Sequence, residues 1–155
     1  DSIGVGASVG SILNDHGWKN HYKFNAGSTV HNPNDEYEAN VTNKEFFANL
    51  KAQAWWMLAD RFRNTYNAIH KGAEFPADQM ISISGDMNKK LLDQLVTELS
   101  TPLRVKNSQG KVQVESKADL DKRKIASPNI ADAVIIAASH HIVDRGDGYD
   151  WGAFA

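Results

Sequence analysis

The chain has no cysteine among its 155 residues. This excludes disulfides, thiolate zinc sites and cysteine nucleophiles, and it fits a reducing compartment. No apolar run approaches the roughly 18 residues that a membrane-spanning helix needs. The remaining composition, 41% hydrophobic and 23% charged residues with a formal net charge of −2, is typical of one globular domain. The net charge does not decide the substrate, because only the face that meets a ligand must complement it.

The sequence also lacks a Walker A motif, and the spacing of Gly4, Gly6 and Gly10 does not fit a dinucleotide fingerprint. A nucleotide-binding function is therefore not predicted. The chain starts at Asp1 without an initiator methionine and runs directly into a glycine turn. We expect it to be a fragment of a longer protein.

Hydrophobic periodicity predicts alternating strands and helices. Residues 5–17 should form a short helix, residues 21–25 a short strand and residues 26–41 a loop. Thr42 and Glu45 have the spacing of a capping box, which predicts the start of one long helix that ends at Gly72. The second half is expected to contain a strand over 80–84, a helix over 91–99, a β-hairpin over 103–115, a helix over 117–123 and a last helix beginning at Ser127-Pro128.

These elements predict an α/β domain with a mixed sheet flanked by helices, together with the hairpin. We expect the domain to cover residues 1–143 and residues 144–155 to form a mobile tail. Trp55 and Trp56 lie at helical spacing, which favours the core over base stacking. His140 and His141 are adjacent on a helix, so they cannot easily share one metal ion.

Asp132 is the first candidate for chemistry. It lies between Ala131 and Ala133 in a helix that otherwise looks buried, and a buried carboxylate needs a cation or a metal as partner. The alternative is a helix-start aspartate that faces solvent and the positive end of the helix dipole. The residues alone do not decide between the two interpretations.

Asp1 is the second candidate, because α/β folds collect ligands at strand ends before glycine-rich turns. Two carboxylates suggest a site for Mg²⁺ or Mn²⁺, and pairs of such ions commonly hydrolyse phosphodiesters. Asp1 and Asp132 would hold part of such a pair, and further ligands would be needed.

Four motifs, in order, resemble those of tailed-phage terminase large subunits. Asp1–Gly6 is similar to their "D-x-x-G-x-G" turn, and Phe46–Trp56 is similar to their "F-x-N-x-K-A-Q-x-W-W" helix. Val114-Glu115-Ser116-Lys117 and Ser127–Ala133 are similar to "I-E-x-K" and "S-P-D-x-A-D-A". The resemblance runs from Asp1 to about Ser139.

The resemblance implies an RNase H-like nuclease domain that cuts concatemeric viral DNA during genome packaging. Asp1 and Asp132 would be catalytic carboxylates that bind two Mg²⁺ or Mn²⁺ ions. The implied partners are double-stranded DNA, the terminase ATPase domain, the small terminase subunit and the portal protein, in the host cytoplasm and away from membranes.

The sequence departs from the family pattern at two points. The first catalytic aspartate of the family lies on an earlier strand that this sequence lacks, and Asn129 stands where many members have aspartate. We therefore expect the first strands to be missing and this polypeptide alone to have weak or no activity.

Basic residues on the hairpin and ahead of Asp132 are candidates for phosphate contact. Lys117 ranks first because it falls in the "I-E-x-K" pattern. The other candidates are Arg104, Lys106, Lys111, Lys122, Arg123 and Lys124. The alternative is a solvated charged face that also carries Asp119 and Asp121.

Two other functions remain open. One is a different RNase H-like nuclease such as a junction resolvase, which the "K-A-Q-x-W-W" helix disfavours. The other is a non-catalytic docking or regulatory module whose carboxylates are structural.

Overall fold

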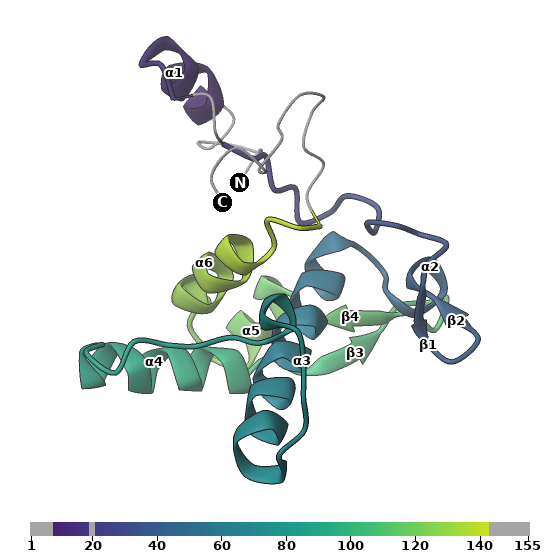
Figure 1. The fold of residues 1–155 in the computed structure, drawn as a ribbon. Helices are drawn as coiled ribbons and strands as arrows, with labels where there is room; N and C mark the ends of the chain where they lie inside the picture. The colour runs from purple at the N-terminus through teal and green to yellow at the C-terminus, as the bar shows by residue number, and fades with distance from the viewer. Residues whose placement is uncertain (1–7, 19–20, 143–155) are drawn as a thin grey trace.

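The computed structural model describes residues 8–18 and 21–142. Its helices are α1 (Val9–Asp15), α2 (Asn43–Phe46), α3 (Leu50–Lys71), α4 (Lys89–Ser100), α5 (Lys117–Lys122) and α6 (Asn129–Ala138), with a 3-10 turn, η2, at Ala77–Gln79. Figure 1 shows α3 at the centre, with α4 and α6 to one side and α2 to the other. The helices in this part of the chain include none that is long and apolar enough to cross a membrane.

The strands of the described residues form two small antiparallel sheets. β1 (Glu36–Glu38) pairs with β2 (Val41–Thr42), and β3 (Arg104–Lys106) pairs with β4 (Val112–Val114). The second sheet is the predicted hairpin, and its turn contains Gly110 at a φ of +77°. A parallel bridge between Phe47 and Val112 attaches β4 to the segment before α3. The predicted α/β class is confirmed.

The core forms around the first half of α3. Its buried residues Leu50, Ala54, Trp55 and Leu58 pack against buried residues of the other elements, which include Leu95 of α4, Val114 of β4 and Ala131 and Ile135 of α6. Burying each large aliphatic side chain stabilises the fold by roughly 1.5–3 kcal/mol. Trp55 is buried in this core and Trp56 is partly buried against it, as their helical spacing predicts.

The predicted long helix is instead two helices. Glu45 does close the capping box, because its carboxylate accepts from the Thr42 backbone N–H at 2.8 Å and the Thr42 hydroxyl at 2.6 Å. Phe47 then turns extended (φ −98°, ψ 141°) and is almost fully buried. Burial of its ring and the bridge to β4 outweigh helical propensity. A second cap, Asn49, starts α3 by accepting from the Ala52 N–H at 2.9 Å.

Three other sequence-based expectations are wrong. Residues 21–25 and 80–84 form no strand, and the expected loop over residues 26–41 contains β1 and the start of β2. The Ile81 N–H and C=O both bind the Thr65 hydroxyl of α3, at 2.9 Å each. A helix side chain thus satisfies the backbone groups that a neighbouring strand would otherwise pair.

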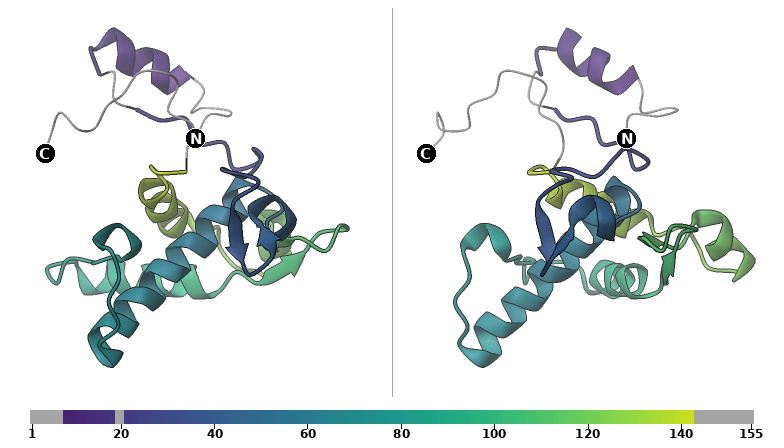
Figure 2. Two further views of the ribbon diagram at one scale, coloured as in Figure 1. Left: turned by 45° about the vertical axis from the view of Figure 1, so that its right-hand side comes forward. Right: turned by 90° about the vertical axis from the view of Figure 1, so that its right-hand side faces the viewer.

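The first predicted helix is present as α1, which lies apart from the other helices in both views of Figure 2. Its apolar residues Val9 and Ile12 are exposed, and none of its residues is buried. The predicted helices over residues 91–99, 117–123 and after Ser127 are confirmed as α4, α5 and α6. Asp1 and residues 144–155 lie outside the described residues.

Candidate functional site

Asp132 lies in the first turn of α6. Pro128, rather than the expected Ser127, occupies the N-cap of this helix and offers no side-chain acceptor. Glu98 of α4 supplies the acceptor instead, because its Oε2 accepts from the N–H groups of Ile130 at 2.7 Å and Ala131 at 3.0 Å. Its Oε1 accepts from Gln94 at 2.8 Å. The start of α6 is therefore fixed by a neighbouring helix.

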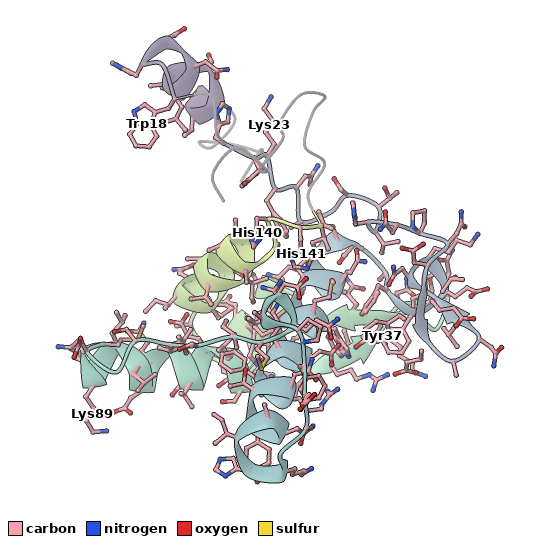
Figure 3. All side chains as sticks on the ribbon, in the orientation of Figure 1. Trp18, Lys23, Tyr37, Lys89, His140 and His141 are labelled. Carbon is pink, nitrogen blue, oxygen red and sulfur yellow. The ribbon has the colours of Figure 1, made fainter. Side chains whose placement is uncertain are left out.

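The end of α6 is held by Arg61 of α3. The Nη1 of Arg61 donates to the Ala138 carbonyl at 3.2 Å, and its Nη2 lies 3.2 Å from Nδ1 of His141. Burial, and then the charge of Arg61, lower the pKa of His141 to about 4, so the ring is neutral at pH 7 and can accept this hydrogen bond. Figure 3 shows His140 and His141 together where α6 ends.

The carboxylate of Asp132 has two lysine partners. Lys51 of α3 places its Nζ 3.0 Å from Oδ1, and Lys117 of α5 places its Nζ 3.3 Å from Oδ2. The Asp132 side chain is only 20% exposed. The structure thus combines the two interpretations of the sequence, since Asp132 starts a helix and is also charge-compensated in a half-buried position.

Three segments that resemble family motifs meet at this carboxylate, although Lys51, Lys117 and Asp132 are far apart in the sequence. The same segments also carry buried polar residues that shape the scaffold. Gln53 accepts from the His31 N–H at 2.7 Å and donates to the His31 carbonyl at 3.0 Å. Glu115 accepts from the Leu103 N–H at 3.0 Å and pairs with Arg123.

Lys51 is a site residue that the sequence analysis missed. A signal for it is present in the sequence, because Lys51 is the one charged residue between Phe46 and Ala59. A lysine on a buried helix face needs an anionic partner, just as Asp132 needs a cation. The sequence therefore indicated that Lys51 and Asp132 each need an oppositely charged partner, but not that they pair with each other.

The cations proposed for DNA contact have different surroundings. Arg104 lies over aromatic rings of α2 and α3, with its guanidinium carbon 5.8 Å from the ring centroids of both Phe46 and Trp56. Lys122 pairs with Asp119 at 2.7 Å, and Arg123 pairs with Glu115. Within residues 8–18 and 21–142 no ion pair is formed by the remaining three, Lys106, Lys111 and Lys124.

The oxygen chemistry of Asp132 fits one ligand of Mg²⁺ or Mn²⁺. A complete ligand set is not found among the described residues, where no group of three or more His, Cys, Asp or Glu side chains is placed to hold an ion. The expected second ligand, Asp1, lies outside them, so its meeting with Asp132 stays a prediction.

Comparison with solved structures shows which known domain shares this fold. The chain matches a lysine-to-alanine mutant of the nuclease domain of the large terminase subunit gp2 of bacterial virus Sf6, with manganese and beta-thujaplicinol, at 29% identity and a TM-score of 0.80. The same domain without the mutation matches at 28% identity and 0.70, and the mutant with calcium at 26% and 0.75. No protein-family model and no curated protein matches the sequence.

These matches cover 89%, 84% and 89% of the chain, respectively, and the chain spans 62%, 60% and 62% of the matched domains. Sequence identities of 26–29% over most of the chain show that the similarity to these domains extends beyond the fold to the sequence. The predicted RNase H-like fold and the resemblance to terminase nuclease domains are confirmed.

Proposed function

We propose that this chain, which has the fold of a large-terminase nuclease domain, acts as a metal-dependent DNA endonuclease in viral genome packaging. The structural match over 89% of the chain carries this proposal. The convergence of three motif segments on Asp132 supports it. The substrate that the resemblance implies is concatemeric viral DNA.

We also propose that Asp132 binds Mg²⁺ or Mn²⁺ together with Asp1, in a site for two ions. Solved neighbours that contain manganese or calcium support the use of a divalent cation. Such a pair supplies an activated water and stabilises the leaving oxygen. The chain's own contribution is to hold the Asp132 carboxylate on the anchored start of α6, with Lys51 and Lys117 compensating its charge.

The proposed DNA contacts are sequence-independent. Lys117 is the leading candidate because it borders Asp132 and its side chain is 58% exposed. The further candidates are Arg104, Lys106, Lys111, Lys122, Arg123 and Lys124. The ATPase domain, the small terminase subunit and the portal protein are proposed partners, and the host cytoplasm is the proposed location.

The test of the proposal is the isosteric variant Asp132→Asn. It removes the anionic oxygen ligand, so Mn²⁺-dependent nicking of plasmid DNA should fall at least about 100-fold, because even residues behind a metal ligand often contribute 10- to 100-fold. Asp93→Asn, an exposed carboxylate of α4 that also pairs with a lysine, is the matched control and should cut normally. Wild-type rates from folded Asp132→Asn protein would contradict the proposal.

One observation favours a second candidate function, a non-catalytic docking or regulatory module. Both oxygens of Asp132 are already salt-bridged, as in a purely structural ion pair. Under this alternative no Mn²⁺-dependent cutting appears even when the strands expected before Asp1 are supplied, and Asp132→Asn lowers stability only. A junction resolvase has less support, because the solved neighbours are terminase nuclease domains.

A further inference from the structure

We propose that Lys51 is a positioning residue for Asp132. Its ammonium group fixes one carboxylate oxygen and leaves the other directed at an incoming divalent cation. This inference rests on the proposed nuclease function and adds a residue that does not itself touch the metal or the DNA.

The two lysines at Asp132 differ in their surroundings. The Lys51 side chain is 23% exposed and approaches Oδ1 to 3.0 Å, whereas Lys117 is 58% exposed and lies 3.3 Å from Oδ2. Solvent and salt weaken an exposed pair more than a half-buried one. The ion pair between Lys51 and Oδ1 is therefore the more stable of the two. The weaker pair between Lys117 and Oδ2 can be replaced by a bound cation.

The backbones on both sides of this pair are fixed. Lys51 is in the first turn of α3, where Asn49 caps the helix through the Ala52 N–H. Asp132 is in the first turn of α6, where Glu98 binds the Ile130 and Ala131 N–H groups. Because both helix starts are held, the main motion left to Asp132 is rotation of its carboxylate. The ion pair with Lys51 restricts this rotation. Metal ligands need such support, because a site is productive only within about 0.5 Å and 10–20°.

Replacing Lys51 with methionine keeps an apolar stem and removes the charge. Loss of a like charge near the cation should tighten Mn²⁺ binding, lowering the Kd roughly 3- to 10-fold. The freed carboxylate should slow cutting at saturating Mn²⁺ by roughly 10- to 100-fold. Mn²⁺ binding thus becomes tighter while DNA cutting becomes slower. A merely structural defect would instead weaken binding and cutting together.

Lys51→Arg separates charge from geometry. It keeps the positive charge, so the Mn²⁺ Kd should stay near the wild-type value. Its longer, planar group moves the donor, so the rate at saturating Mn²⁺ should fall, but less than in Lys51→Met. If Lys51→Met does not fold, this variant alone decides, and a wild-type rate overturns the inference.

The experiment measures Mn²⁺ binding by isothermal titration calorimetry and plasmid nicking at saturating Mn²⁺, each on the 155-residue chain with the strands expected before Asp1 supplied. Lys89→Met is the matched control, because Lys89 makes an equally short, 3.0 Å pair with Asp93 at the outer end of α4. The control should change neither quantity. An active wild type with a Lys51→Met variant that matches it in both would overturn this inference alone. A wild type that neither binds Mn²⁺ nor cuts DNA, even with the strands expected before Asp1 supplied, would overturn the proposed function and this inference with it.

Discussion

Arg104 packs over aromatic rings and is also a proposed phosphate contact. Its guanidinium lies over Phe46 and Trp56, and Phe46 packs against Tyr37 and Phe47 with ring centroids 4.7 and 4.8 Å apart. An arginine over aromatic faces is attracted by the negative face of the ring quadrupole. Its N–H groups remain able to donate outward, so phosphate contact is compatible with this position.

Arg104→Gln should lower the free energy of unfolding by about 0.5–1 kcal/mol, since the variant loses the attraction between the cation and the rings. Urea denaturation monitored by tryptophan fluorescence measures this difference. Lys106→Gln, in the same exposed strand β3, is the control and should lie within about 0.5 kcal/mol of wild type. Equal effects of the two substitutions would show that the rings do not hold Arg104.

Helix α6 shows how one element carries the site. Its N-cap is a proline and its first free N–H groups are bound by Glu98, a residue 32 positions earlier than Ile130. Arg61 binds the opposite end at the Ala138 carbonyl. Two free N–H groups at the start of α6 and one carbonyl at its end are thus bound from other helices, which fixes the position of α6 and of Asp132.

Glu98→Ala should destabilise the protein by about 1–3 kcal/mol, because it leaves two part-buried N–H groups unpaired. Hydrogen exchange of the Ile130 and Ala131 amides should accelerate more than that of α3 amides. Glu98→Gln keeps an acceptor of the same shape and should lose less. Glu74→Ala, at an exposed position after α3, serves as the neutral control. Unchanged exchange in α6 would mean that Glu98 does not cap it.

At the scale of the whole molecule, His141 ties the residues after α6 to the central helix α3. Burial, the charge of Arg61 and the neighbouring His140 and His31 hold its pKa at about 4, below its ordinary value of 6.5. The unfolded chain therefore binds a proton between these pH values while the folded chain does not. Stability from this group is complete above pH 6.5 and is lost as the pH falls toward 4.

His141→Gln should make the free energy of unfolding less dependent on pH between 6.5 and 4, because the variant has no ring to protonate. Urea titrations of both proteins at several pH values in this window measure the slopes. The comparison removes the contribution of the carboxylates, which also lose favourable interactions in acid. Identical slopes would show that His141 titrates normally in the folded protein.

The sequence by itself determined the helices over residues 91–99 and 117–123, the last helix and the hairpin, and it indicated that the Asp132 carboxylate needs a cationic partner. Hydrophobic periodicity, helix-capping residues and turn residues are local signals, so they can be read from one chain segment without knowing what it packs against. The motifs also pointed to the fold that the solved terminase nuclease domains share.

Only the tertiary structure decided the break at Phe47, the absence of strands over residues 21–25 and 80–84, and the joining of Lys51 to Asp132. Each of these depends on contacts between distant residues: a ring buried beside β4, backbone groups bound by Thr65, and two charges that compensate each other. Local propensities amount to a few tenths of a kcal/mol per residue, whereas burying a large apolar side chain contributes roughly 1.5–3 kcal/mol and leaving one half of a buried charge pair alone costs about 3–5 kcal/mol. Sequence patterns therefore located the elements, and packing chose their partners.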